Sequence, residues 1–135
     1  AGKFEGWGTS FCWWPNRIGY LDELSEQAAK LFFDPKEGLG LNIIRYNIGG
    51  GDDQLIIILQ ETDFDGAWDA INPSHDANGY HWSYDWNADQ NQRNVLMKVA
   101  ECYGKDLIVE GFSNSPPYFM TNSGCSSGSV NAGEK

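Results

Sequence analysis

Residues 41–48, with the sequence LNIIRYNI, decide the fold class of this 135-residue chain. The stretch is a nearly continuous apolar and β-branched run that is interrupted by Asn42 and Arg45 and followed by glycines at 49–51. Such a run, without polar alternation, is typical of a strand that is buried on both faces, and strands of that kind belong to parallel sheets. We therefore predict a parallel strand at 41–48.

A strand and a helix are predicted before this stretch. Residues 4–11 are short, aromatic and punctuated by glycine, which indicates a first strand. Between residues 20 and 33, apolar side chains recur at intervals of three and four, so we predict a helix that ends before Pro35. The residues expected on its apolar face are Leu21, Leu24, Ala28, Leu31 and Phe32.

A second helix and a third strand are predicted after it. Residues 92–103 repeat the helical spacing, and Gly104 is placed to cap the C-terminus of this helix. Residues 107–112 (LIVEGF) then form a strand. The order strand, helix, strand, helix, strand is typical of right-handed βαβ units, so the predicted fold class is α/β with a parallel sheet.

Charge and cysteine content exclude several classes of protein. The chain has 19 acidic and 9 basic side chains and a net charge of −10, which disfavours nucleic acid and anionic membranes as partners. The cysteines at 12, 102 and 125 are too few and too widely spaced for a disulfide framework or a zinc site. Cys102 is expected to be a buried thiol, and a pairing of Cys12 with Cys125 stays open.

Residues suited to sugar binding follow all three predicted strands. These loops emerge at the carboxyl ends of parallel strands, where α/β proteins form their active sites. The segment 51–90 is predicted to be a long functional loop. Aromatic rings pack against the C–H faces of sugars, while carboxylates, amides and guanidinium groups bind the hydroxyls. The candidate side chains are Trp13, Trp14, Asp52, Asp53, the aromatic run 80–84, and the polar residues from Ser113 to Tyr118.

A structural role is the alternative for each of these residues. The tryptophans could fill the rim of the sheet as core residues, and Asp52 or Asp53 could simply solvate a loop. Arg45 is costly within a buried strand unless it is paired, so we expect a carboxylate of the site to hold it; the alternative is a structural ion pair. His75 and His81 lie in the predicted long loop without a partner at metal-ligand spacing.

Four segments together resemble glycoside hydrolase family 30, and most closely its endo-β-1,6-galactanase-like branch. They are FEGWGTSFCWW at 4–14, GLNIIRYNIGGGDD at 40–53, YDWNADQNQRNVL at 84–96 and GFSNSPPYFMTNSGCSSG at 111–128. The resemblance implies a (β/α)8 barrel and a retaining glycosidase that uses two glutamates at the ends of the fourth and seventh strands. It implies no metal or organic cofactor, a carbohydrate substrate, and a secreted or extracellular protein.

By this resemblance, residues 1–135 are the N-terminal part of the catalytic barrel, about as far as its third strand, without a complete second domain. No catalytic residue is assigned in the chain, and both glutamates are expected beyond residue 135. Arg45 matches an arginine that positions the catalytic carboxylates, and Asp52 matches an acidic residue that binds hydroxyls of the innermost sugar. Ser113 and Asn114 stand where other branches place an aromatic residue, and Tyr118 belongs to the same substrate-binding loop.

Three hypotheses remain open at this point. The chain is part of a retaining glycoside hydrolase acting on a β-linked polysaccharide such as β-1,6-galactan, or a non-catalytic carbohydrate-binding protein derived from the same barrel, or a structural remnant. The first hypothesis predicts that the 135 residues by themselves lack glycosidase activity. It also predicts a cut-open barrel that is unstable in isolation, with Ile43 and Ile108 facing no opposite wall.

Overall fold

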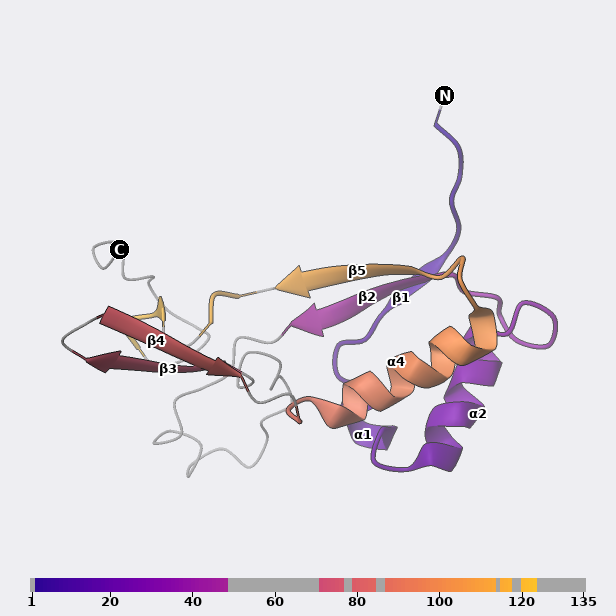
Figure 1. Ribbon diagram of the computed structural model, residues 1–135. Helices are drawn as coiled ribbons and strands as arrows, with labels where there is room; N and C mark the ends of the chain where they lie inside the picture. The colour runs from indigo at the N-terminus through magenta and orange to yellow at the C-terminus, as the bar shows by residue number, and fades with distance from the viewer. Residues whose placement is uncertain are drawn as a thin grey trace. The chain divides into compact units, whose positions relative to one another are not determined.

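The computed structural model describes residues 2–48, 71–76, 79–84, 87–113, 115–117 and 120–123 (Figure 1). The chain divides into two compact units. The first unit comprises residues 1–47 and 90–112, and the second comprises residues 48–89 and 113–135.

The first unit is built on a three-stranded sheet with the order β1-β2-β5. Strand β1 spans Gly8–Ser10, β2 spans Ile43–Ile48 and β5 spans Ile108–Ser113. β1 and β2 are parallel, with Ser10 opposite Arg45, and β5 runs in the same direction as β2 (Figure 1). All three strands lie where the sequence predicts them, although β1 is shorter than expected.

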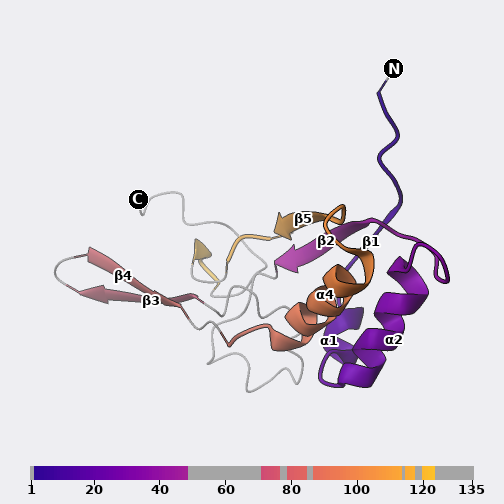
Figure 2. The same ribbon diagram turned by 45° about the vertical axis from the view of Figure 1, so that its right-hand side comes forward.

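Helices cover one face of this sheet, as Figures 1 and 2 both show. They are α1 (Trp14–Ile18), α2 (Asp22–Phe33) and α4 (Gln90–Tyr103). The predicted ends of the two long helices are confirmed: α2 ends at Phe33, two residues before Pro35, and Gly104, with φ of 94°, donates its N–H to Ala100 O at 2.9 Å. Gly104 therefore caps the helix in a left-handed backbone conformation, which a residue with a Cβ would adopt only under strain.

The buried core lies between the sheet and the helices. The fully buried members of this cluster are Phe11, Ala29, Phe33, Ile44, Val95 and Val99. Four of the five predicted elements contribute, because Phe11 follows β1, Ile44 lies on β2, and the remaining four lie on α2 and α4, whereas β5 contributes none. The helical spacing predicted for residues 92–103 is confirmed, since Val95 and Val99 are fully buried on one face of α4.

The predicted apolar face of α2 is confirmed at Ala28, which is buried, and is wrong at the larger residues of the helix. Leu24, Leu31 and Phe32 are 38%, 64% and 37% exposed. Small side chains allow the helix to approach its neighbours closely, so the buried face is set by them and by the final phenylalanine, and the larger aliphatic side chains stay outside. The buried residues of α2 are Ser25, Ala28, Ala29 and Phe33.

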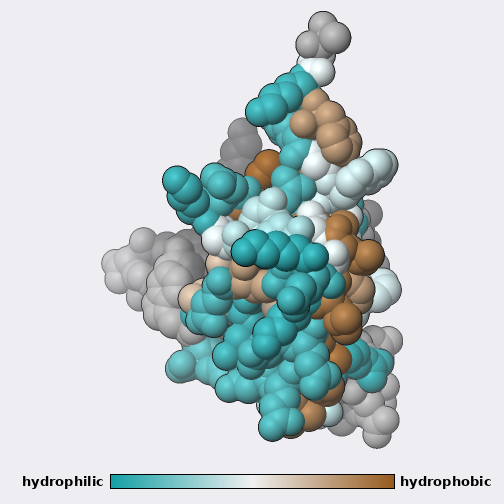
Figure 3. All heavy atoms as spheres, turned by 90° about the vertical axis from the view of Figure 1, so that its right-hand side faces the viewer, coloured by the Kyte–Doolittle hydropathy of each residue, from teal (hydrophilic) through white to brown (hydrophobic). Residues whose placement is uncertain are grey.

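Apolar side chains consequently remain at the surface. Figure 3 shows one face of the molecule, on which they gather in a band beside a mostly hydrophilic area. At the sheet, Ile108 and Val109 on β5 are 39% and 47% exposed. Within the residues that the structure describes, β1 and β5 are the edge strands of the sheet, which agrees with the expected open barrel.

The short helix α1, which the sequence analysis did not predict, is fixed against α4 by asparagine side chains. Asn94 Nδ2 donates to Gly19 O at 2.8 Å, and Asn91 Nδ2 donates to Asn16 O at 3.2 Å. A Cβ at Gly19 would lie 2.0 Å from Asn91 O. Glycine is therefore required here by the close approach of two backbones.

A buried glutamine joins α4 to β2. Gln92 Nε2 donates to Asn47 O at 2.9 Å, and Gln92 Oε1 accepts the Asn47 N–H at 3.1 Å. Gln92 and Asn47 are 2% and 5% exposed, so neither backbone group of Asn47 relies on bulk water for a partner. This side chain holds the last part of β2 against the first turn of the helix.

The second unit contains an antiparallel hairpin of β3 (Ile71–Asp76) and β4 (Gly79–Tyr84). His75 lies opposite Tyr80 and His81 lies opposite Ser74. The prediction that 51–90 is a loop throughout is therefore wrong at these residues. The sequence Asn78-Gly79 is typical of a two-residue hairpin turn, and the run that follows alternates aromatic and polar residues. This local pattern favours a hairpin over a loop.

No helix among the described residues is long and apolar enough to cross a membrane.

Replacement of Gln92 by methionine, which has a similar size, should destabilise the protein. Both backbone groups of Asn47 would lose a buried partner, and each such loss costs about 1–3 kcal/mol. We expect urea denaturation to show a lower free energy of unfolding for Gln92→Met by about 2–4 kcal/mol. Gln90→Met, at an exposed position of the same helix, is the control; equal stability of the two variants would contradict the role of Gln92.

Candidate functional site

The pairing of β1 with β2 in the first unit brings Ser10 and Arg45 together. They are paired in the register of β1 with β2, and Arg45 Nη2 donates to Ser10 Oγ at 3.3 Å. The same Oγ accepts the N–H of Cys12 at 3.2 Å. The turn after β1 therefore fixes the serine hydroxyl, and the serine in turn holds one side of the guanidinium group.

Phe112, near the end of β5, contacts the face of the same guanidinium group. Arg45 Cζ lies 4.2 Å from the centre of the Phe112 ring, a cation–π arrangement. Arg45 Nε is buried and has no hydrogen-bond partner within the described residues. A buried N–H of a charged group without an acceptor is costly, and it marks a place where an acceptor from elsewhere would be stabilising.

The carboxylate expected to hold Arg45 is not found in the part of the chain that the structure describes. There, Lys30 and Glu26 on α2 form the only ion pair. Arg45 is instead contacted by a hydroxyl and an aromatic ring, neither of which neutralises its charge. Neither the expected carboxylate nor the alternative of a structural ion pair is present among these residues.

Cys12, whose N–H donates to Ser10 Oγ, also contacts Asn47. Cys12 is a half-buried free thiol whose Sγ donates to Asn47 Oδ1 at 3.1 Å. Its hypothetical partner Cys125 lies outside the described residues. The thiol therefore serves as a hydrogen-bond donor between the ends of β1 and β2 in this structure.

The two neighbouring tryptophans after β1 differ in environment. Trp13 is 56% exposed and has φ of 125° and ψ of −11°, a strained backbone for a residue with a Cβ. Trp14 is half-buried; its Nε1 donates to Ser10 O at 3.0 Å and its ring packs edge-on against Phe11 and Phe32. Trp13 is thus the exposed member of the pair, whereas Trp14 supports the turn.

The other predicted residues are placed only in part. Ser113 is the last residue of β5, and its Oγ donates to Ser115 O at 2.8 Å. Asp52, Asn114 and Tyr118 lie outside the described residues. Ser10 and Phe112 were not predicted as site residues. Both contact Arg45 only because strands that are far apart in the sequence pair in the sheet.

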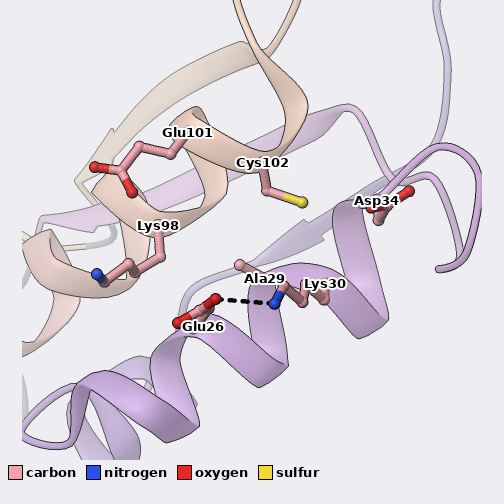
Figure 4. A pocket seen from close by; sticks show the side chains of 7 residues that line it. All are labelled: Glu26, Ala29, Lys30, Asp34, Lys98, Glu101 and Cys102. Carbon is pink, nitrogen blue, oxygen red and sulfur yellow. Dashed lines mark hydrogen bonds and ion pairs between the residues drawn. The ribbon is translucent and has the colours of Figure 1, made fainter.

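A separate hollow of about 370 Å³ lies between α2 and α4 (Figure 4). It is lined by Glu26, Ala29, Lys30, Asp34, Lys98, Glu101 and Cys102. The Lys30 ammonium, 2.8 Å from Glu26, lowers the pKa of that carboxyl group. Burial raises the pKa of the Cys102 thiol, which disfavours the reactive thiolate.

This hollow contains none of the sequence-predicted site residues. Within the described ranges, no group of His, Cys, Asp and Glu side chains is arranged to hold a metal ion.

The parallel order β1-β2-β5, with helices on one face of the sheet, is that of a segment of an α/β barrel. The structure is similar to the catalytic domain of GH30 xylanase C from Talaromyces cellulolyticus, with a TM-score of 0.52 and 20% identity over 91% of this chain and 28% of that one. At this identity the likeness shows the fold alone, and it confirms that the chain has the architecture of part of a (β/α)8 barrel. No family model matches the chain.

Two characterised enzymes are similar in sequence over nearly the whole chain. One is an endo-β-1,6-galactanase of Hypocrea rufa, 34% identical over 95% of this chain. The other is an exo-β-1,6-galactobiohydrolase of Bifidobacterium longum, 30% identical over 98% of this chain. The chain spans only 29% and 12% of their lengths. These relatives confirm the resemblance to the endo-β-1,6-galactanase-like branch.

The strained backbone at Trp13 should lower the free energy of unfolding of the protein. Glycine adopts positive φ without a steric cost, whereas alanine retains the Cβ that causes the strain. We expect Trp13→Gly to be more stable than Trp13→Ala by about 1 kcal/mol in urea denaturation. Glycine is ordinarily the less stable choice outside left-handed positions, so the opposite order would show that Trp13 is unstrained.

Proposed function

We propose that the chain is the N-terminal part of the catalytic domain of a retaining β-glycoside hydrolase that acts on β-1,6-galactan. Residues 1–135 supply about the first three barrel strands and the helices between them, without a complete second domain. The sequence similarity to the two β-1,6-galactan-directed enzymes supports the substrate class. The GH30 catalytic-domain fold supports the family.

The observation that supports this proposal most strongly is the lack of a carboxylate partner for Arg45 among the described residues. Its charge is not neutralised by any carboxylate in the described part of the chain, and its Nε is buried without an acceptor. It is paired with Ser10, the last residue of β1, and barrel enzymes bind substrate at the carboxyl ends of their strands. An arginine in this position is suited to hold carboxylates that other strands of the barrel contribute.

The proposed reaction uses two such carboxyl groups, about 5–5.5 Å apart, from outside this segment. One attacks the anomeric carbon while the other protonates the leaving oxygen; the second group then activates the water that releases the sugar. Arg45 orients the carboxylates and favours the ionised form of the one that attacks the anomeric carbon. The exposed ring of Trp13 stacks on a sugar face.

The remaining predicted residues complete the substrate site in this proposal. Asp52 binds hydroxyls of the innermost sugar, and Ser113, Asn114 and Tyr118 bind the same sugar. Trp14 contributes by holding the turn that carries Trp13, through its bond to Ser10 O. The reaction needs no metal or organic cofactor, and a polysaccharide substrate favours a secreted or extracellular location.

The activity is tested on the longer protein that carries this sequence. We expect it to release galactose or galacto-oligosaccharides from β-1,6-galactan, with β products detected first by proton NMR because a double displacement retains the anomeric configuration. Xylan is the comparison substrate. Inverted products, or turnover of xylan with none of β-1,6-galactan, would contradict the proposed mechanism or substrate.

Replacement of Arg45 by alanine in the same protein should lower kcat by at least about a hundredfold, because a disordered carboxylate pair loses transition-state stabilisation. The melting temperature should change little, since Arg45 forms no ion pair in the described residues. Arg17→Ala, in the last turn of α1, is the control. A large loss of stability with kcat preserved would identify Arg45 as a purely structural residue.

A further inference from the structure

The guanidinium group of Arg45 is oriented by two side chains that have no assigned role. Ser10 Oγ accepts from Nη2 at 3.3 Å, and the Phe112 ring covers the group at 4.2 Å. These residues come from β1 and β5, the two strands that flank β2. Arg45 is therefore held from both neighbouring strands, by a hydrogen bond to Ser10 on one side and by the ring of Phe112 on the other.

The hydroxyl of Ser10 is also held by a second hydrogen bond, from the backbone. It accepts the Cys12 N–H at 3.2 Å, so the turn after β1 sets its position. With Cys12 N and Arg45 Nη2 both donating to this oxygen, its lone pairs are used and its own hydrogen remains to be donated. No acceptor for that hydrogen is found among the described residues.

Within the described part of the chain, two neighbouring groups thus carry an N–H or O–H without an acceptor: Arg45 at Nε and Ser10 at Oγ. Both are donors, and one of them is cationic, so the group that fits them is an anion with more than one oxygen, such as a carboxylate. A second cation or an amide N–H would be repelled or left unpaired. Arg45 and Ser10 are therefore suited to bind a carboxylate that another residue supplies.

We propose that Ser10 and Phe112 are positioning residues that hold Arg45 in the orientation needed to bind a catalytic carboxylate. This inference rests on the proposed function, because the reaction defines which carboxylate is bound. Ser10 fixes the rotation of the guanidinium plane, and Phe112 keeps water from its covered face and stabilises its charge. Neither residue contacts the sugar.

The test is a double-mutant cycle in the longer active protein. Ser10→Ala should lower kcat about tenfold with KM nearly unchanged, which is the range for one hydrogen bond to a charged group. Phe112→Leu should lower kcat about fivefold through the lost cation–π contact. In the Arg45→Ala background, each replacement should change kcat by less than about twofold, because the group that it positions is gone.

Matched variants separate positioning from packing. Phe112→Tyr retains the ring and should restore most of the activity, and Ser10→Thr retains the hydroxyl. Thr9→Ala removes the neighbouring hydroxyl of β1, which donates only to Ser10 O at 3.4 Å, and should leave kcat unchanged.

The outcomes distinguish the inference from the function on which it rests. Equal losses in the wild-type and Arg45→Ala backgrounds, or no loss from Ser10→Ala and Phe112→Leu in an active enzyme, would overturn the positioning role while the proposed function stands. A wild-type protein without activity on β-1,6-galactan would overturn the proposed function and this inference with it.

Discussion

The parallel pairing of β1 with β2 is the constraint on which the first unit depends. Its register sets Ser10 opposite Arg45, and the same alignment continues beyond β1 where Phe11 N donates to Arg45 O at 2.9 Å. At the other end, Trp7 O accepts from Asn42 N, while Asn42 Oδ1 accepts from Trp7 N. A shift of one residue would turn Ile44 out of the core and separate Arg45 from its contacts.

Much of this architecture could be predicted from local signals. The apolar run at 41–48 and the helix ends at Pro35 and Gly104 depend on backbone chemistry that acts over a few residues. The buried face of α2 could not be predicted by the size of its apolar residues, because Ala29 and its small neighbours allow close packing that Leu31 would prevent. The β3–β4 hairpin was missed although its Asn-Gly dipeptide is a local signal.

The candidate site was less accessible to sequence reasoning. Arg45 could be identified because a guanidinium group within an apolar strand requires an explanation. Its partners could not, since Ser10 is 35 residues away in the sequence and becomes a neighbour only through the strand register. The difference between Trp13 and Trp14 also depends on tertiary structure: identical side chains next to each other are separated into an exposed ring and a packed one by the strained turn.

The bond between Gln92 and the backbone of Asn47 couples the motions of two elements. Because a helix side chain satisfies both peptide groups, the end of β2 can open locally only when the first turn of α4 also moves. Cys12 bonds to the side chain of the same asparagine, so this opening would also reach the turn that carries Trp13. Fluctuations of the turn that carries Trp13 are therefore limited by the docking of α4 against the end of β2.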